Sequence, residues 1–186
     1  MKAINHFSSL LCVFLLILSS CGEANGDKDP MNDEPEVKKI DACELISSAD
    51  LSSIAGAELN AMETTWLEGN DFYHYVSLCG FFHGDIVVTI RFGQRKVVVD
   101  PIKRRDTSVG IQKEDPDISS AEAVDVNGLP GLYYEEKDAD INLTMNVLMF
   151  YSGQFETTLI CTQDISKTEM LKISEKMAAS VVAKTQ

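Results

Sequence analysis

The sequence is poor in the residues on which hydrolytic active sites depend. It has 3 histidines in 186 residues, and a hydrolytic triad requires a histidine within hydrogen-bond reach of its nucleophile. His74 and His83 are nine residues apart in one predicted strand, so they should lie on opposite faces of a sheet. The sequence therefore indicates no catalytic residues, and we do not expect an enzyme.

Closely spaced metal ligands are also lacking. No Cys-x-x-Cys pair occurs, so a zinc site built from Cys43, Cys79, Cys161 and His83 has no support from spacing. No Asp-x-Asp-x-Asp-Gly calcium loop occurs among the many acids. We therefore expect neither a metal site nor a cofactor.

Positive charge is scarce over the whole chain. It has 16 Lys and Arg against 29 Asp and Glu, for a formal net charge of -13. Such a balance repels both nucleic acid and anionic membrane surfaces, and favours solubility or a cationic partner. We expect no nucleic-acid binding.

No apolar run is long enough to cross a membrane as a helix of ~20 residues. The longest, residues 10–18, follows the single base Lys2 and is typical of a signal peptide. Residues 18–21, Leu-Ser-Ser-Cys, resemble the lipobox of a bacterial lipoprotein. The resemblance implies removal of residues 1–20 and acylation of Cys21 with palmitate or a similar chain.

The resemblance to a lipobox also implies a location. Two or three acyl chains hold a protein stably on a membrane, so the protein should be a membrane-anchored lipoprotein of the cell envelope. Gly22 in place of Asp favours the outer membrane if the cell is Gram-negative. The alternative is an ordinary secretory signal cut near Ser20, which would leave Cys21 as a free thiol.

The chain after the predicted cleavage site divides into two parts. Residues 21–40 combine the acylated cysteine with Gly, Asn, Pro and a run of acids, and have little to bury. They should form a disordered acidic tether. Residues 41–186 are enough for one domain with its own core.

Polar side chains predict two helix starts at the beginning of this domain. Asp41 and Ser47 each stand three residues before an acid, a spacing typical of helix caps. The helix after Ser47 should end at Gly56, which can adopt the left-handed conformation. Residues 59–67 are β-prone.

Gly84 and Asp85 form a two-residue connection that predicts a tight hairpin. Pairing the residues that flank it sets Cys79 opposite Ile90 on an apolar face. Cys79 should therefore point into the core.

A second hairpin is expected around Gly153, between the alternating apolar runs 141–149 and 155–161. A two-residue turn would place the two apolar sets on opposite faces of the sheet. A three-residue loop with Gly153 in the left-handed region would pair Leu143 with Cys161 and keep both sets on one face. We prefer this second arrangement, which buries Cys161.

The remaining segments complete the order of elements. Residues 94–122 read as a short helix or irregular excursion followed by a surface loop, and residues 123–126 as a short strand. Ser166 and Glu169 form a capping box that should open a C-terminal amphipathic helix. The order predicts an α+β fold, an antiparallel sheet with an N-terminal and a C-terminal helix packed on one face.

Three short motifs suggest a family: residues 41–50 with Gly56, residues 79–81, and residues 126–131 with Tyr133. They resemble an uncharacterised bacterial envelope lipoprotein domain. In that family a Cys-x-Leu-Leu-Thr helix start precedes a Cys-x-Trp or Cys-x-Phe strand and a Val-x-Gly-Leu-Gly turn. The likeness spans most of residues 42–183, with Ile-Ser in place of Leu-Thr and Pro130 inside the turn.

The resemblance implies a small α+β sheet and no catalytic activity. It also implies a disulfide between Cys43 and Cys79, the positions that match the two family cysteines. Spacing alone leaves a bridge from Cys161 to either of them open.

Six basic residues crowd one segment of this acidic chain: Arg91, Arg95, Lys96, Lys103, Arg104 and Arg105. They are a candidate contact patch. The favoured interpretation is that they neutralise nearby acids: Asp100, Asp106, Glu114 and Asp115.

The leading functional hypothesis is a lipid-anchored, non-enzymatic domain. It would bind a protein or another envelope component through its sheet or through the loop after Phe92. The alternative is a thiol-based redox sensor or enzyme that uses the unpaired cysteine. A third hypothesis is an inhibitor of a cationic envelope-degrading enzyme, which an acidic surface would suit.

Overall fold

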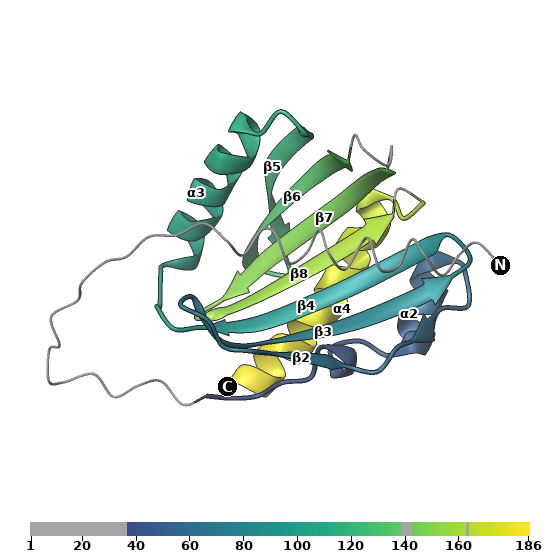
Figure 1. Ribbon diagram of the computed structural model, residues 1–186, viewed down its shortest axis with the longest axis horizontal. Coiled ribbons are helices and arrows are strands. Elements are labelled where there is room, and N and C mark those ends of the chain that lie inside the picture. The colour runs from purple at the N-terminus through teal and green to yellow at the C-terminus, as the bar shows by residue number, and fades with distance from the viewer. Residues whose placement is uncertain (1–36, 139–142, 163) are drawn as a thin grey trace, which may run out of the picture. The chain divides into compact units, whose positions relative to one another are not determined.

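The computed structural model describes residues 37–138, 143–162 and 164–186 (Figure 1). The predicted signal peptide, Cys21 and most of the predicted tether lie outside the described residues. None of the described helices is long and apolar enough to cross a membrane.

The described residues build one antiparallel sheet of eight strands. Its order is β1-β3-β4-β8-β7-β6-β5, with β2 also paired to β3. The strands are β1 (Asn60–Ala61), β2 (Thr65–Glu68), β3 (Tyr73–His83), β4 (Ile86–Arg95), β5 (Ile118–Val126), β6 (Leu129–Asp138), β7 (Leu143–Ser152) and β8 (Phe155–Thr162). The helical elements are η1 (Ala42–Glu44), α2 (Ser48–Ala55), α3 (Pro101–Glu114) and α4 (Lys167–Thr185). The predicted α+β class with an antiparallel sheet is confirmed.

The predicted helix caps are present. Asp41 accepts a hydrogen bond from the backbone N–H of Cys43, and Ser47 caps α2 by accepting from Asp50. Gly56 ends α2 with a φ of 68°, the left-handed conformation that glycine adopts at little cost. Ser166 opens α4 with the predicted capping box.

The hairpin of β3 and β4 has the predicted register. His83 pairs with Ile86 across the two-residue turn, and Cys79 pairs with Ile90. Cys79 and Ile90 are both fully buried. The alternation of apolar residues therefore identified the core face of the central strands.

The expected register of the β7–β8 hairpin is wrong. Ser152 pairs with Phe155 across a two-residue turn, and Cys161 lies opposite Asn146 rather than Leu143. Gly153 does have a positive φ of 57°. Cys161 is buried as expected, although by a different pairing.

Both faces of the sheet carry apolar clusters, which explains the β7–β8 register. Leu148 belongs to the main core together with Leu51 of α2 and Met170 of α4. Val147, next to it in β7, belongs to a second cluster with Val109 of α3. Adjacent residues of a strand point to opposite faces. The two apolar sets of this hairpin can therefore both be buried without sharing a face.

The segment after β4 is more regular than the sequence suggested. Residues 101–114 form α3, which begins at the N-cap Asp100 and has Pro101 in its first turn. Strand β5 then begins at Ile118, where a surface loop was expected, and continues through residues 123–126. Helix α3 packs against β5, β6 and β7 on the face of the sheet opposite the main core, and Arg104 in its first turns reaches Glu156 of β8.

Candidate functional site

Glu156 is a buried carboxylate near the start of a central strand of the sheet. Its strand, β8, lies between β4 and β7, and its side chain is only 3% exposed. Glu156 pairs with Gly93 and therefore shares the face of Arg91, two residues earlier in β4. A charged group buried in this way must be paired to be tolerated.

Three arginines converge on this carboxylate. Arg91 donates to Oε1 at 2.7 Å, Arg104 donates to Oε2, and Arg95 lies 3.5 Å from Oε2. Arg91 and Arg95 come from β4, and Arg104 comes from the first turns of α3. We call Glu156 and these three residues the arginine cluster.

Two tyrosines complete the surroundings of the cluster. The Tyr73 hydroxyl donates to Glu156 Oε1 at 2.7 Å, and the guanidinium groups of Arg91 and Arg95 stack over its ring. Arg104 stacks over Tyr151, 4.7 Å from the ring centroid. Gly93 makes room for the Tyr73 ring, because a Cβ there would lie 2.9 Å from Tyr73 Cδ1.

The charges of the cluster do not balance. Burial by itself would raise the pKa of Glu156, but Arg91 and Arg104 outweigh it and hold the pKa below its ordinary value. Burial would likewise lower the pKa of Arg91, and the attraction of Glu156 raises it instead. The lowered pKa keeps Glu156 ionised at neutral pH, and arginine side chains stay charged in proteins. The cluster therefore carries one negative charge against three positive ones.

An unsatisfied hydroxyl lies beside the cluster. Thr158 pairs with Arg91 across β4 and β8 and is 5% exposed. Its Oγ1 has no hydrogen-bond partner among the described residues. A hydroxyl buried in this way would be satisfied by an additional polar group near the arginines.

The six basic residues of the predicted contact patch are divided by the fold. Arg91, Arg95 and Arg104 lie in the cluster, with side chains 10–25% exposed. Lys96 and Lys103 are exposed, and Arg105 pairs with Asp106. The neutralising acid is mainly Glu156, which the sequence argument did not name, while Asp100 caps α3.

Sequence reasoning missed Glu156 and the two tyrosines that surround the cluster, Tyr73 and Tyr151. One signal could have revealed Glu156. It is the only charged residue of the strand 155–162, which is otherwise apolar or hydroxyl-bearing. A lone carboxylate in such a strand calls for a basic partner.

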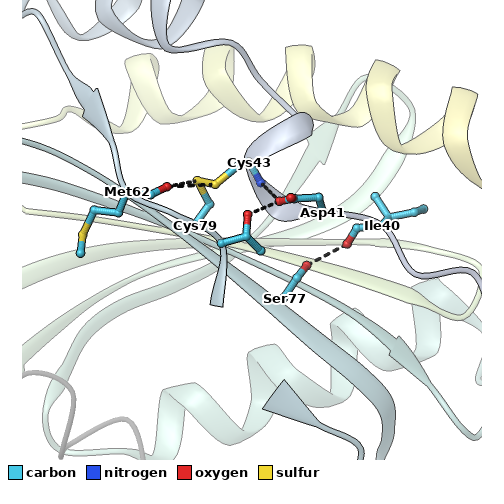
Figure 2. Close-up of a disulfide and its surroundings, with 7 residues drawn as sticks. Ile40, Asp41, Cys43, Met62, Ser77 and Cys79 are labelled. Atoms are coloured by element: carbon cyan, nitrogen blue, oxygen red, sulfur yellow. Dashed lines mark hydrogen bonds between the residues drawn. A yellow bond between two sulfur atoms is a disulfide. The ribbon is translucent and has the colours of Figure 1, made fainter. Parts of the chain in front are cut away.

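The cysteines are arranged as the lipoprotein resemblance implied. Cys43 forms a disulfide with Cys79, joining η1 to β3 (Figure 2). The carbonyl oxygen of Met62 lies 3.4 Å from Cys43 Sγ, and Ser77 Oγ donates to the Ile40 carbonyl at 2.9 Å. The bridge ties the start of the domain to the central hairpin and withdraws both sulfurs from any metal site.

Cys161 is the unpaired cysteine of the described residues. It is 1% exposed. Burial raises the pKa of its thiol far above the ordinary value. The thiolate, which is the reactive form, is therefore disfavoured.

Comparison with known proteins gives one family match. Residues 84–177 match the model of a domain of unknown function, DUF4367. The chain belongs to this family. No curated protein matches the chain.

The DUF4367 match covers β4, α3, the four following strands and part of α4. All four residues of the arginine cluster lie inside it. Cys43 and Cys79 lie outside it, so the disulfide belongs to the part of the chain that precedes the matched region.

Proposed function

We propose that this DUF4367 protein is a lipid-anchored, non-enzymatic domain of the bacterial cell envelope. Acylated Cys21 would hold it on a membrane, and the tether would carry the folded domain. The domain would bind an anionic group of an envelope component, protein or otherwise. In a Gram-negative cell we expect the outer membrane.

The arginine cluster is the observation that carries this proposal. One carboxylate aligns three guanidinium groups but neutralises only one of their charges. Guanidinium groups suit carboxylates and phosphates because their planar donors match these oxyanions. Glu156 and the two tyrosines hold the arginines in place, which reduces the entropy lost when an anion binds.

Inorganic phosphate is a simple probe of the site. We expect it to raise the melting temperature of the full chain when ionic strength is held constant, because a ligand of the native state stabilises it. Arg95→Gln should reduce this effect, since Arg95 is the most exposed arginine of the cluster. Arg105→Gln is the matched control, because Arg105 is bonded to Asp106 outside the cluster.

The three proteins distinguish specific binding from a general salt effect. The proposal expects a phosphate-dependent shift in the wild type and in Arg105→Gln that is diminished in Arg95→Gln. Equal shifts in all three proteins, or no shift in any, would contradict anion binding at the cluster.

The thiol-based alternative gains no support from the described structure. Its candidate, Cys161, is buried and has a raised pKa. The inhibitor hypothesis rests only on the acidic composition and stays a prediction.

A further inference from the structure

Large apolar side chains are exposed together at one end of the sheet. Val97 and Val98 follow β4 and are 64% and 66% exposed, Ile102 in the first turn of α3 is 55% exposed, and Phe72 is 54% exposed. The backbone N–H of Lys96 donates to the Phe72 carbonyl at 3.0 Å, which places Phe72 beside the residues that follow β4. We call these four residues the apolar tip. Grouped apolar side chains on a surface mark an interaction site.

Basic residues flank the apolar tip. Residues 95–106 contain five bases and two acids, although the chain as a whole has a charge of -13. Asp100 is engaged as the cap of α3 and Asp106 pairs with Arg105. Lys96 and Lys103 are exposed on either side of the valines. Apolar groups framed by lysines suit an anionic lipid surface.

The chain enters the folded domain at the same end. The backbone N–H of Lys38 donates to Gln94 Oε1 at 2.9 Å, one residue before Arg95. Figure 1 shows the first described residues and the connection between β4 and α3 at one end of the sheet. Cys21 lies 17 residues before Lys38. A chain of that length spans roughly 23 Å when flexible and about 60 Å at most.

We propose that the apolar tip docks on the surface of a membrane that contains anionic phospholipids. Val97 and Val98 enter the boundary between headgroups and acyl chains, and Lys96 and Lys103 contact lipid phosphates. The arginine cluster lies at this same end, because it includes Arg95. The anion that the cluster binds is then a headgroup phosphate. This inference rests on the proposed function and names its ligand.

Tryptophan placed in the tip reports its depth in the membrane. We compare Val98→Trp with Ile111→Trp in the full acylated chain, both in a Trp66→Phe background so that the chain has one tryptophan. Ile111 is the matched control, because it is also exposed, at 61%, and lies in the same helix as Ile102. Ile111 is nine positions after Ile102, which corresponds to about 13 Å along the helix.

The chain is reconstituted into vesicles of phosphatidylcholine and phosphatidylglycerol with brominated acyl chains, which quench nearby tryptophan. We expect the fluorescence of Val98→Trp to fall at least about twofold, because a docked side chain reaches the acyl boundary. The fluorescence of Ile111→Trp should stay unchanged. Quenching of Val98→Trp should weaken in pure phosphatidylcholine and when Lys96→Gln and Lys103→Gln are added.

Membrane docking, recognition of the phospholipid anion and attachment to the vesicles are tested by different outcomes. If the chain stays on the vesicles but Val98→Trp is quenched no more than Ile111→Trp, docking is refuted and the anchor stands; such a tip would suit a protein partner instead. If Val98→Trp is quenched equally with and without anionic lipid, and equally with and without the two lysine substitutions, the protein does not recognise the phospholipid anion. If soluble glycerol phosphate protects the arginine cluster from phenylglyoxal modification but anionic vesicles do not, the anion bound is a free phosphate. A chain that does not remain with the vesicles contradicts the proposed function itself.

Discussion

Glu156 shows how a single buried carboxylate can determine the arrangement of the side chains around it. Three arginines, two tyrosines and a glycine are arranged around it, and they come from β3, β4, β7 and α3. Removing one member of a buried group of charges lowers the stability of the fold, because the remaining charges stay buried without a partner.

We therefore predict that Glu156→Gln lowers the free energy of unfolding by about 3 kcal/mol near neutral pH. Urea unfolding measures the loss. Glu122→Gln is the control, because Glu122 is 51% exposed and its pair with Lys167 should contribute less than about 1 kcal/mol. Equal losses in the two variants would contradict the importance assigned to the cluster.

The contribution of Glu156 should also depend on pH. Its pKa is lower in the folded chain than the ordinary 4.5, so the unfolded chain takes up a proton first as the pH falls. The stabilisation is complete above about pH 5 and is lost as the pH falls from there through the folded-state pKa. The difference between wild type and Glu156→Gln should shrink near pH 3, whereas a constant difference would show that the charge of Glu156 is not responsible.

Among the helices and strands, the sequence predicted best those elements whose start or register depends on a single local feature, such as a capping side chain or a tight turn. Capping side chains located α2 and α4, and the Gly84-Asp85 turn set the register of β3 and β4. The β7–β8 register could not be predicted in the same way. A three-residue loop would suit a sheet covered on one face, and the observed two-residue turn suits a sheet covered on both faces. The second face is covered by α3, which is far away in the sequence.

The arginine cluster was out of reach of sequence reasoning for a related reason. The candidate basic residues were recognised from their crowding, but their common partner is 65 residues from Arg91. Only the pairing of β4 with β8 brings the two together. The local sequence could identify the arginines as a candidate patch, but it could not predict the acid with which they form ion pairs.

Strand β4 offers a direct test of how the elements form the cluster. Gly93→Ala should push the Tyr73 ring away from Glu156 and destabilise the protein by roughly 1–3 kcal/mol, because the new Cβ would overlap the ring. Gly110→Ala in α3 meets no atom within 4 Å and should instead stabilise the protein by up to about 1 kcal/mol through helix propensity. Thermal unfolding measures both, and a tolerated Gly93→Ala would show that the ring does not need this space.

At the scale of the whole molecule, the disulfide connects the start of the domain to the sheet. Closing a loop of 36 residues should contribute about 3–4 kcal/mol in the chain-entropy model. Cys43→Ser and Cys79→Ser should therefore lower stability to the same extent, and the double variant should lose no more than either. Urea unfolding of the wild type with and without reductant gives the matching measurement, and additive losses would contradict the bridge.

Membrane attachment is predicted to depend on a single residue. Cys21→Ala should release the protein from membranes, because a chain without its acyl groups loses its anchor. The domain should keep its fold, which circular dichroism can check. Fractionation and palmitate labelling measure the attachment, and palmitate that still enters the variant would show that the lipobox interpretation is wrong.

Site-specific photo-crosslinking on intact membranes can show whether the arginine cluster of the anchored domain binds an envelope component. A photoreactive residue replaces Lys103, exposed beside the cluster, or Lys172, exposed on α4 at the other face. We predict a discrete lipid or protein adduct from position 103 that is absent from position 172 and diminished by Arg95→Gln. Identical adducts from both positions, or none from position 103 of the anchored chain, would contradict binding at the arginine cluster.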